Sequence, residues 1–181
     1  MTKIALVIGH NVRSQGAVRV TDQRTEYDWC ADLAAAIRDS GPGIYEIFRR
    51  PAGRPYSAEI RETYSALSAK GALASVELHF NGGPANATGT ETLTSGSVGS
   101  RRLAGLIQPA MVQALGLRDR GIIARSKNDR GGLSLHAGRP PAVLLEPYFG
   151  SNPGDCDAAT RNFSALARAI HGACLAYLKG L

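Results

Sequence analysis

Cysteine is scarce in this chain and follows no metal-binding pattern. The three cysteines, Cys30, Cys156 and Cys174, lie far apart in the sequence and form no CxxC pair. That spacing argues against a zinc site made of paired thiolates, and an odd number of cysteines argues against a disulfide framework. We therefore expect reduced thiols that are mostly buried.

Long apolar runs and several familiar catalytic motifs are also absent. The apolar stretch over residues 4–8 is too short for the core of a signal peptide, and no run approaches the ~20 residues of a membrane span. The sequence contains no GxSxG, HExxH, P-loop or GxGxxG motif. We expect synthesis in the cytoplasm without a signal peptide, no membrane insertion, and no serine-hydrolase, thermolysin-like or nucleotide-dependent chemistry.

Aromatic residues make up only 6% of the chain, whereas the formal net charge is +6. A positive charge attracts polyanions, which include nucleic acids, anionic lipid surfaces and the acidic polymers of bacterial walls. The basic residues are scattered in pairs such as Arg49-Arg50 and Arg101-Arg102, and they form no stripe interleaved with aromatic side chains. This pattern disfavours nucleic acid as the partner.

The length of 181 residues and the hydrophobic content of 44% suit one domain over residues 1–181. Apolar runs alternate with segments of helical spacing. We expect an α/β fold with a twisted, mostly parallel or mixed sheet, helices on both faces, and functional sites at the carboxyl ends of strands. The expected strands are 3–9, 44–50, 75–80, 90–94 and 142–149. The expected helices are one capped by Thr25 and ended by Gly41-Pro42-Gly43, then 57–74, 100–115 and 156–178. Residues 118–135 are loop-rich, with room for short strands.

Two histidines lie in or directly after expected strands. His10 directly follows the first strand, and His79 lies in the third. A catalytic zinc ion prefers three nitrogen or carboxylate ligands and an open position for water, which two histidines and one carboxylate provide. Glu26 is the favoured carboxylate because it starts the helix that returns from the first strand. Asp22 and Asp28 are nearby competitors.

Glu146 is the most informative carboxylate because it interrupts the last apolar strand. Apolar residues 142–145 precede it, and two aromatic residues at 148–149 follow closely. Burying an isolated charge is costly, so such a group is normally paired, linked to a metal or held with a raised pKa. Beside an activated water molecule it is a general base. The alternatives are a salt bridge to an arginine or an outward-facing side chain.

The ordered set of His10, Glu26, His79 and Glu146, each in its local motif, resembles the zinc-dependent N-acetylmuramoyl-L-alanine amidases of the amidase-3 type. In that family the first zinc histidine stands in a Gly-His context, the second ligand is a glutamate at the next helix, and the third lies in a Ser-x-His-x-Asn segment. The catalytic glutamate lies in a Pro-Ala-Val-Leu-x-Glu-x-x-Phe-x-x-Asn segment, which residues 141–152 match. The resemblance implies one zinc ion held by His10, Glu26 and His79, with Glu146 as the catalytic residue.

The chain departs from the family pattern at two places. Asn11-Val12 stands where the family usually has further glycine, and Glu77 stands where it usually has serine. His136 imitates the third-ligand motif, but its position just before Pro141 corresponds to a substrate-facing segment. The resemblance therefore assigns Asn81 and His136 to substrate binding, with a structural role as the alternative for His136.

The implied reaction is hydrolysis of the amide between N-acetylmuramic acid and L-alanine, with peptidoglycan as the partner. The alternatives are a related zinc amidohydrolase or carboxypeptidase that acts on a small acyl-amino acid or peptide, and a catalytically inactive wall-binding relative. The lack of an export signal and of a separate wall-binding segment is typical of a phage or prophage endolysin. Such an enzyme acts at the bacterial wall after release by a holin or another delivery system.

Overall fold

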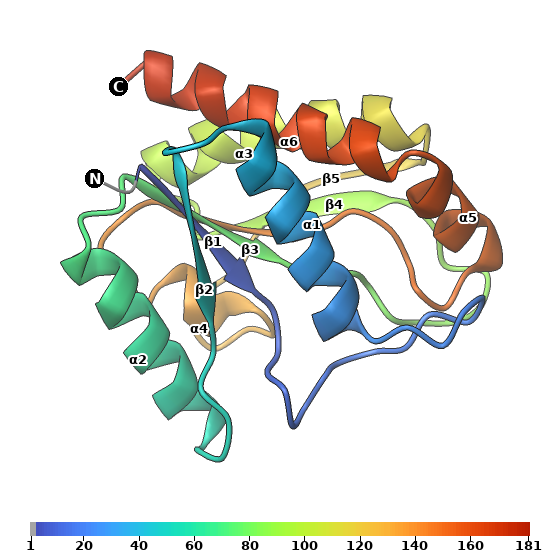
Figure 1. The fold of residues 1–181 in the computed structure, drawn as a ribbon, viewed down its shortest axis with the longest axis horizontal. Helices are drawn as coiled ribbons and strands as arrows, with labels where there is room; N and C mark the ends of the chain where they lie inside the picture. The colour runs from blue at the N-terminus through green and yellow to red at the C-terminus, as the bar shows by residue number, and fades with distance from the viewer. Residues whose placement is uncertain (1–2) are drawn as a thin grey trace.

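The computed structural model describes residues 3–181, and the first two residues of the expected domain, Met1 and Thr2, lie outside the described part. The chain forms a six-stranded sheet with the order β2-β1-β3-β6-β4-β5, and helices cover both faces of it (Figure 1). This confirms the expected α/β class. The strands are β1 (Ile4–Ile8), β2 (Tyr45–Arg49), β3 (Ala74–Leu78), β4 (Thr90–Thr94), β5 (Asp119–Ala124) and β6 (Ala142–Glu146). The helices are α1 (Glu26–Ser40), α2 (Tyr56–Ala69), α3 (Val98–Leu115), α4 (Gly132–Leu135), α5 (Pro153–Arg161) and α6 (Phe163–Lys179).

The sheet is mixed. β1 pairs in parallel with β2 and β3, and β3 pairs in parallel with β6. β4 runs antiparallel to β6 and parallel to β5. Because β1, β3 and β6 are adjacent and parallel, their carboxyl ends lie side by side. The segments that follow these three strands therefore meet at one end of the sheet, where α/β folds normally bind ligands.

Apolar side chains form one cluster on each face of the sheet. The larger cluster joins the sheet to α1, α3 and α6 through residues such as Trp29, Leu103 and Ile170. The smaller cluster includes Ile60 and Tyr64 of α2 on the opposite face. Figure 1 shows α1 and α6 on one side of the sheet and α2 and α4 on the other. Burying each large apolar side chain contributes ~1.5–3 kcal/mol, so the strands that lead to the site are firmly held.

Helix α1 begins where the sequence predicts. Thr25 has an extended backbone conformation, and its hydroxyl accepts a hydrogen bond from the amide of Asp28, as an N-cap residue does. In the first turn, Trp29 packs edge-on against Tyr148, with 4.8 Å between the ring centroids. This contact fixes the start of α1, and Glu26 with it, beside the segment that follows β6.

Two helices have other bounds than the sequence predicts. Helix α2 ends at Ala69 rather than at residue 74, because the chain turns at Gly71 with a φ of +72°. The expected helix over 156–178 is two helices, α5 and α6, which meet at Asn162. Helix α5 also starts earlier, since the side chain of Asn152 caps it and Pro153 occupies its first turn.

Strand β6 ends at Glu146 rather than at residue 149. Pro147 follows, and its missing N–H cannot continue the strand ladder. Glu146 therefore stands at the carboxyl end of the strand instead of interrupting it. Its antiparallel partner on β4 is Glu91.

The structure also bears on two expectations drawn from composition, those for the cysteines and for membrane insertion. All three cysteines are buried and free, as expected. Within residues 3–181, no helix combines the length and the hydrophobicity that crossing a bilayer requires.

Candidate metal centre

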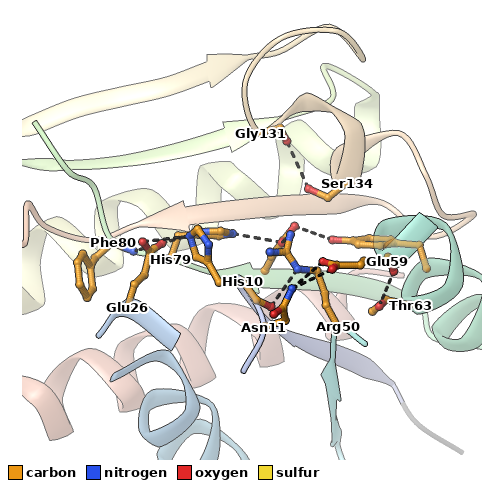
Figure 2. A network of polar contacts seen from close by, with 12 residues as sticks. His10, Asn11, Glu26, Arg50, Glu59, Thr63, His79, Phe80, Gly131 and Ser134 are labelled. Carbon is orange, nitrogen blue, oxygen red and sulfur yellow. Dashed lines mark hydrogen bonds and ion pairs between the residues drawn. The ribbon is translucent and has the colours of Figure 1, made fainter. Parts of the chain in front are cut away.

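His10, Glu26 and His79 meet beyond the carboxyl ends of β1 and β3 (Figure 2). One nitrogen or oxygen atom from each residue lies within 4.8 Å of the others. His10 Nε2 is 3.1 Å from Glu26 Oε2, and His79 Nδ1 is 2.7 Å from Glu26 Oε1. The carboxylate thus lies against both imidazoles, and this set of donors suits a zinc ion.

Glu26, rather than its competitors, is the carboxylate of this cluster. It is buried, and its oxygens also accept hydrogen bonds from the amides of Ala17 at 3.0 Å and Phe80 at 3.2 Å. Asp22 instead pairs with Arg19 at 2.9 Å, and Asp28 is exposed. The backbone contacts hold the Glu26 carboxylate in place without a metal.

Two glycines make room for the cluster. A Cβ atom on Gly9 would lie 2.5 Å from Cε1 of His79, and one on Gly16 would lie 2.5 Å from Oε2 of Glu26. His10 itself has a φ of +66°, a left-handed conformation that costs a non-glycine residue of the order of 1 kcal/mol or more. The Gly-His pair after β1 therefore has a packing reason as well as a chemical one.

Burial and the close contacts within the cluster shift the pKa values of Glu26 and His79. Burial opposes ionisation of Glu26, but hydrogen bonds with His10 and His79 outweigh it, and the pKa of Glu26 lies well below its usual range. Burial likewise opposes charging of His79, but hydrogen bonds with Glu26 and Glu77 raise its pKa to about 10. Without a metal the cluster therefore holds a protonated imidazole against carboxylates. A divalent cation can replace that proton.

Asn11, which departs from the family pattern, organises the loop after His10. Its side-chain oxygen accepts hydrogen bonds from the amides of Arg13 at 2.9 Å and Ser14 at 3.0 Å. Its side-chain nitrogen donates to the carboxylate of Glu59, with 2.9 Å to each oxygen. The asparagine thus closes a turn and ties it to helix α2, so the loop keeps a defined shape without further glycine.

Two buried charged residues were not expected as members of the site: Glu77, which adjoins His79, and Arg50, which adjoins Glu77. Glu77 Oε1 lies 3.2 Å from His79 Nε2, and Arg50 lies 3.8 Å from Glu77. Burial opposes ionisation of Glu77, but its contacts with His79 and Arg50 lower its pKa to about 2. The available signal was a carboxylate within an apolar strand, the same signal that singles out Glu146.

Glu146 lines the same cavity as the three clustered residues. Its Oε2 atom is buried and has no hydrogen-bond partner within the described chain, and no ion pair to an arginine is formed there. Burial raises the pKa of Glu146 to about 8, and the nearby charge of His79 only partly offsets this. A buried carboxylate that is unpaired and has a raised pKa is a candidate functional group rather than a salt-bridge partner.

Asn81 and His136 are placed differently with respect to the cavity. Asn81 lines it, and its side-chain nitrogen is buried without a hydrogen-bond partner in the described chain. His136 caps the end of α4, and its Nε2 atom lies 2.8 Å from the carbonyl oxygen of Arg125. His136 is not among the residues that line the cavity, whereas Arg125 is. The structure therefore brings Asn81, and not His136, to the site.

The cavity around the cluster has a volume of about 700 Å³, which is in the range of sites that bind small ligands. Its wall contains the carboxylates of Glu59 and Glu91 as well as four arginines, Arg50, Arg54, Arg125 and Arg130. It is thus large enough for part of a polymer and offers groups of both charges.

Comparison with known proteins agrees with this geometry. The family model Amidase_3, described as N-acetylmuramoyl-L-alanine amidase, matches residues 4–175. The uncharacterized protein YqiI of Bacillus subtilis is 35% identical over 101 residues, which are 54% of this chain. The match spans about half, 47%, of the length of that protein.

Several solved structures share the fold. An N-acetylmuramoyl-L-alanine amidase of Clostridium difficile 630 is 23% identical, with a TM-score of 0.81 over 98% of this chain and 97% of that one. The catalytic domain of CwlV, an amidase of Bacillus (Paenibacillus) polymyxa var. colistinus, is 23% identical, with a TM-score of 0.80 over 98% and 99%. The catalytic domain of the endolysin CD27L, which targets Clostridia difficile, is 22% identical, with a TM-score of 0.82 over 97% of both chains.

The solved structures establish the fold, and the family model extends over nearly the whole chain. The cluster of two histidines and a glutamate stands where parallel strands of such a fold end. The chain therefore belongs to the Amidase_3 family of N-acetylmuramoyl-L-alanine amidases.

Proposed function

We propose that this protein is a zinc-dependent amidase that cleaves the bond between N-acetylmuramic acid and L-alanine in bacterial peptidoglycan. The observation that carries the proposal is the pairing, in one cavity, of a His-Glu-His cluster with a buried and unpartnered carboxylate oxygen of Glu146. A metal site and a free base side by side are one arrangement that hydrolyses an unactivated amide.

The residues that would hold zinc are His10, Glu26 and His79. A bound zinc ion would polarise the scissile carbonyl and lower the pKa of the attacking water. The donor set fits this ion, since it offers two imidazole nitrogens and one carboxylate and leaves the cavity side open to water and substrate.

Glu146 moves the proton in this proposal. It takes a proton from the water as the oxygen attacks the lactyl carbonyl carbon, and it then gives that proton to the nitrogen of L-alanine as the C–N bond breaks. The products are a lactyl carboxylate and a free amine. In the metal-free protein burial raises the pKa of Glu146, so its carboxylate holds a proton more readily than an exposed carboxylate does.

Other cavity residues would orient the substrate. We assign the unpartnered side-chain nitrogen of Asn81 to a substrate carbonyl oxygen. His136 has a structural role in this proposal, since it holds the carbonyl oxygen of Arg125 at the cavity wall. The net charge of +6 favours adsorption to an anionic wall.

The biological setting we propose is that of an endolysin of phage or prophage origin, which reaches the wall with a holin or another delivery system. The endolysin CD27L shares the fold. The proposed origin is independent of the proposed reaction. An enzyme that remodels the host's own wall would cleave the same bond by the same chemistry.

Purified sacculi provide the test. Zinc-loaded protein should release soluble material from them, a chelator should stop the release, and added zinc should restore it. A small-substrate carboxypeptidase would instead release free amino acids, and an inactive wall-binding relative would sediment with the sacculi without solubilising them. Either of those results would contradict the proposed activity.

A further inference from the structure

Glu77 is a charged residue in β3, a fully buried strand inside the sheet. Strand β3 is buried along its whole length, and the Glu77 residue is 1% exposed. A carboxylate there is tolerated only with partners. Its partners are His79 Nε2 at 3.2 Å and Arg50 at 3.8 Å on one oxygen, and the hydroxyl of Tyr64, which donates to the other oxygen at 3.0 Å.

The two ring nitrogens of His79 face different groups. Nδ1 lies 2.7 Å from Glu26, within the candidate metal cluster, whereas Nε2 faces Glu77. An imidazole that gives the lone pair of Nδ1 to a cation must carry its proton on Nε2. The Glu77 carboxylate is placed to accept that proton in a hydrogen bond.

Arg50 connects this pair to the other histidine. Its Nε atom donates to the backbone carbonyl oxygen of His10 at 3.0 Å, and the other side of the guanidinium group faces Glu77. Arg50 is 7% exposed, so its charge and that of Glu77 balance each other in the interior. Figure 2 shows Arg50 near Asn11 and His10, within one network that also includes His79.

We propose that Glu77 is a positioning residue for the zinc site, which holds His79 with Nε2 protonated and Nδ1 directed at the metal, and that Arg50 ties this carboxylate to the loop of His10. The inference rests on the proposed function, because it requires an ion at His10, Glu26 and His79. The inference goes beyond that function because Glu77 departs from the family pattern, in which serine usually stands at this position. The proposed arrangement consists of the side chains of Glu77, His79 and Arg50.

A carboxylate that accepts the outer N–H of a metal-binding histidine fixes the tautomer and ring orientation and makes the ligating nitrogen more basic. Loss of such a partner typically weakens metal affinity by about 10–100-fold. Glu77→Gln keeps the shape of the side chain and removes its charge. We expect its zinc affinity to fall by about 10-fold or more for that reason.

Asp155→Asn provides a matched control. Asp155 is also buried, at 2% exposure, and its carboxylate accepts hydrogen bonds from the amides of Gly89 and Phe149. It contacts none of the three candidate ligands in the described chain. Its loss should lower stability without changing zinc affinity, which separates positioning of the ligand from general support of the fold.

The first measurement starts from the zinc-loaded wild-type protein and compares it with Glu77→Gln. Nitrogen-15 NMR of the histidine rings should show the His79 proton on Nε2, in a hydrogen bond whose proton resonance moves on Glu77→Gln substitution. The second measurement is zinc affinity by competition with a chelator. A His79 proton on Nδ1 would overturn the inference. So would a zinc affinity of Glu77→Gln within about twofold of the wild-type affinity, because loss of a positioning partner lowers affinity by far more. If the wild type binds no zinc at all, the proposed function fails; if it binds one ion and Glu77→Gln binds it equally well, only the role of Glu77 fails.

Discussion

The backbone amide of His79 donates a hydrogen bond to the carbonyl oxygen of Leu145, at 3.0 Å. This bond continues the parallel register of β3 and β6, in which Leu78 is opposite Leu145. The register places Glu146, the next residue, at the same end of the sheet as His79. Strand pairing thus aligns the proposed general base with a proposed metal ligand, although the two residues are far apart in the sequence.

Glu146→Gln should abolish most of the activity while sparing the metal. Removal of a positioned general acid–base typically costs about 10²–10⁴-fold in rate. No described hydrogen bond to Glu146 Oε2 is lost, so the variant should fold normally. Rates of sacculus solubilisation and zinc content measured together check this; a variant that works at the wild-type rate would remove Glu146 from the mechanism.

Glu26→Gln should lose zinc. The carboxylate is the only acid among the three clustered donors, and we expect affinity to fall by more than the roughly 10–100-fold typical of outer partners. Asp28→Asn is a suitable control, because Asp28 lies in the same turn of α1 but is exposed. Zinc stoichiometry after dialysis distinguishes them, and retention of a full equivalent by Glu26→Gln would show that another group holds the ion.

The stability of the metal-free protein should depend on pH through Glu146. Its pKa rises from 4.5 in the unfolded chain to about 8 in the fold because burial disfavours the ionised form. The folded state therefore binds more protons between these values, and stability from this group is present below pH 4.5 and is lost as the pH rises through about 8. Glu146→Gln lacks this loss.

Denaturant unfolding of the metal-free wild type and of Glu146→Gln from pH 5 to 9 isolates the effect. The variant should gain stability over the wild type as the pH rises, since all other titrating groups are common to both proteins. A constant difference across this range would mean that Glu146 titrates as an ordinary exposed carboxyl group.

Gly9→Ala should damage the metal site through packing alone. The added Cβ would lie 2.5 Å from both Cε1 of His79 and the carbonyl oxygen of Leu78, and such overpacking typically costs ~1–3 kcal/mol. Gly172→Ala is the matched control, because nothing lies within 4 Å of its Cβ position in α6. That change should stabilise the helix by about 0.5–1 kcal/mol. Thermal unfolding and zinc affinity check both variants, and an unchanged His79 site in Gly9→Ala would refute the packing role of this glycine.

Local signals in the sequence predicted the parts of the site that depend on strand ends and caps. His10 follows an apolar strand, and Thr25 caps the helix that begins with Glu26, so both positions could be read from neighbouring residues. The order of the strands could not, because it depends on pairing between distant segments. The antiparallel placement of β4 beside β6 and the pairing of β5 with β4 emerged only from the structure.

Side-chain directions account for the remaining differences. Nothing local to Arg50 or Glu77 indicates that these two residues contact each other or that Glu77 adjoins His79. The motif around His136 suggested a substrate contact, yet the end of α4 directs its ring to the carbonyl oxygen of Arg125. The break at Asn162 was hidden because apolar residues continue at helical spacing on both sides of it.

Identification of the bond that is cut distinguishes an amidase from a peptidase or a glycosidase. Purified sacculi should be digested with the zinc-loaded protein, and the new ends identified by mass spectrometry. The proposed amidase activity predicts free amino groups on L-alanine and free lactyl carboxylates on N-acetylmuramic acid, both absent with Glu146→Gln, and it predicts intact glycan strands with either protein. New ends within the stem peptide or the glycan, or the same products from the Glu146→Gln variant, would contradict it.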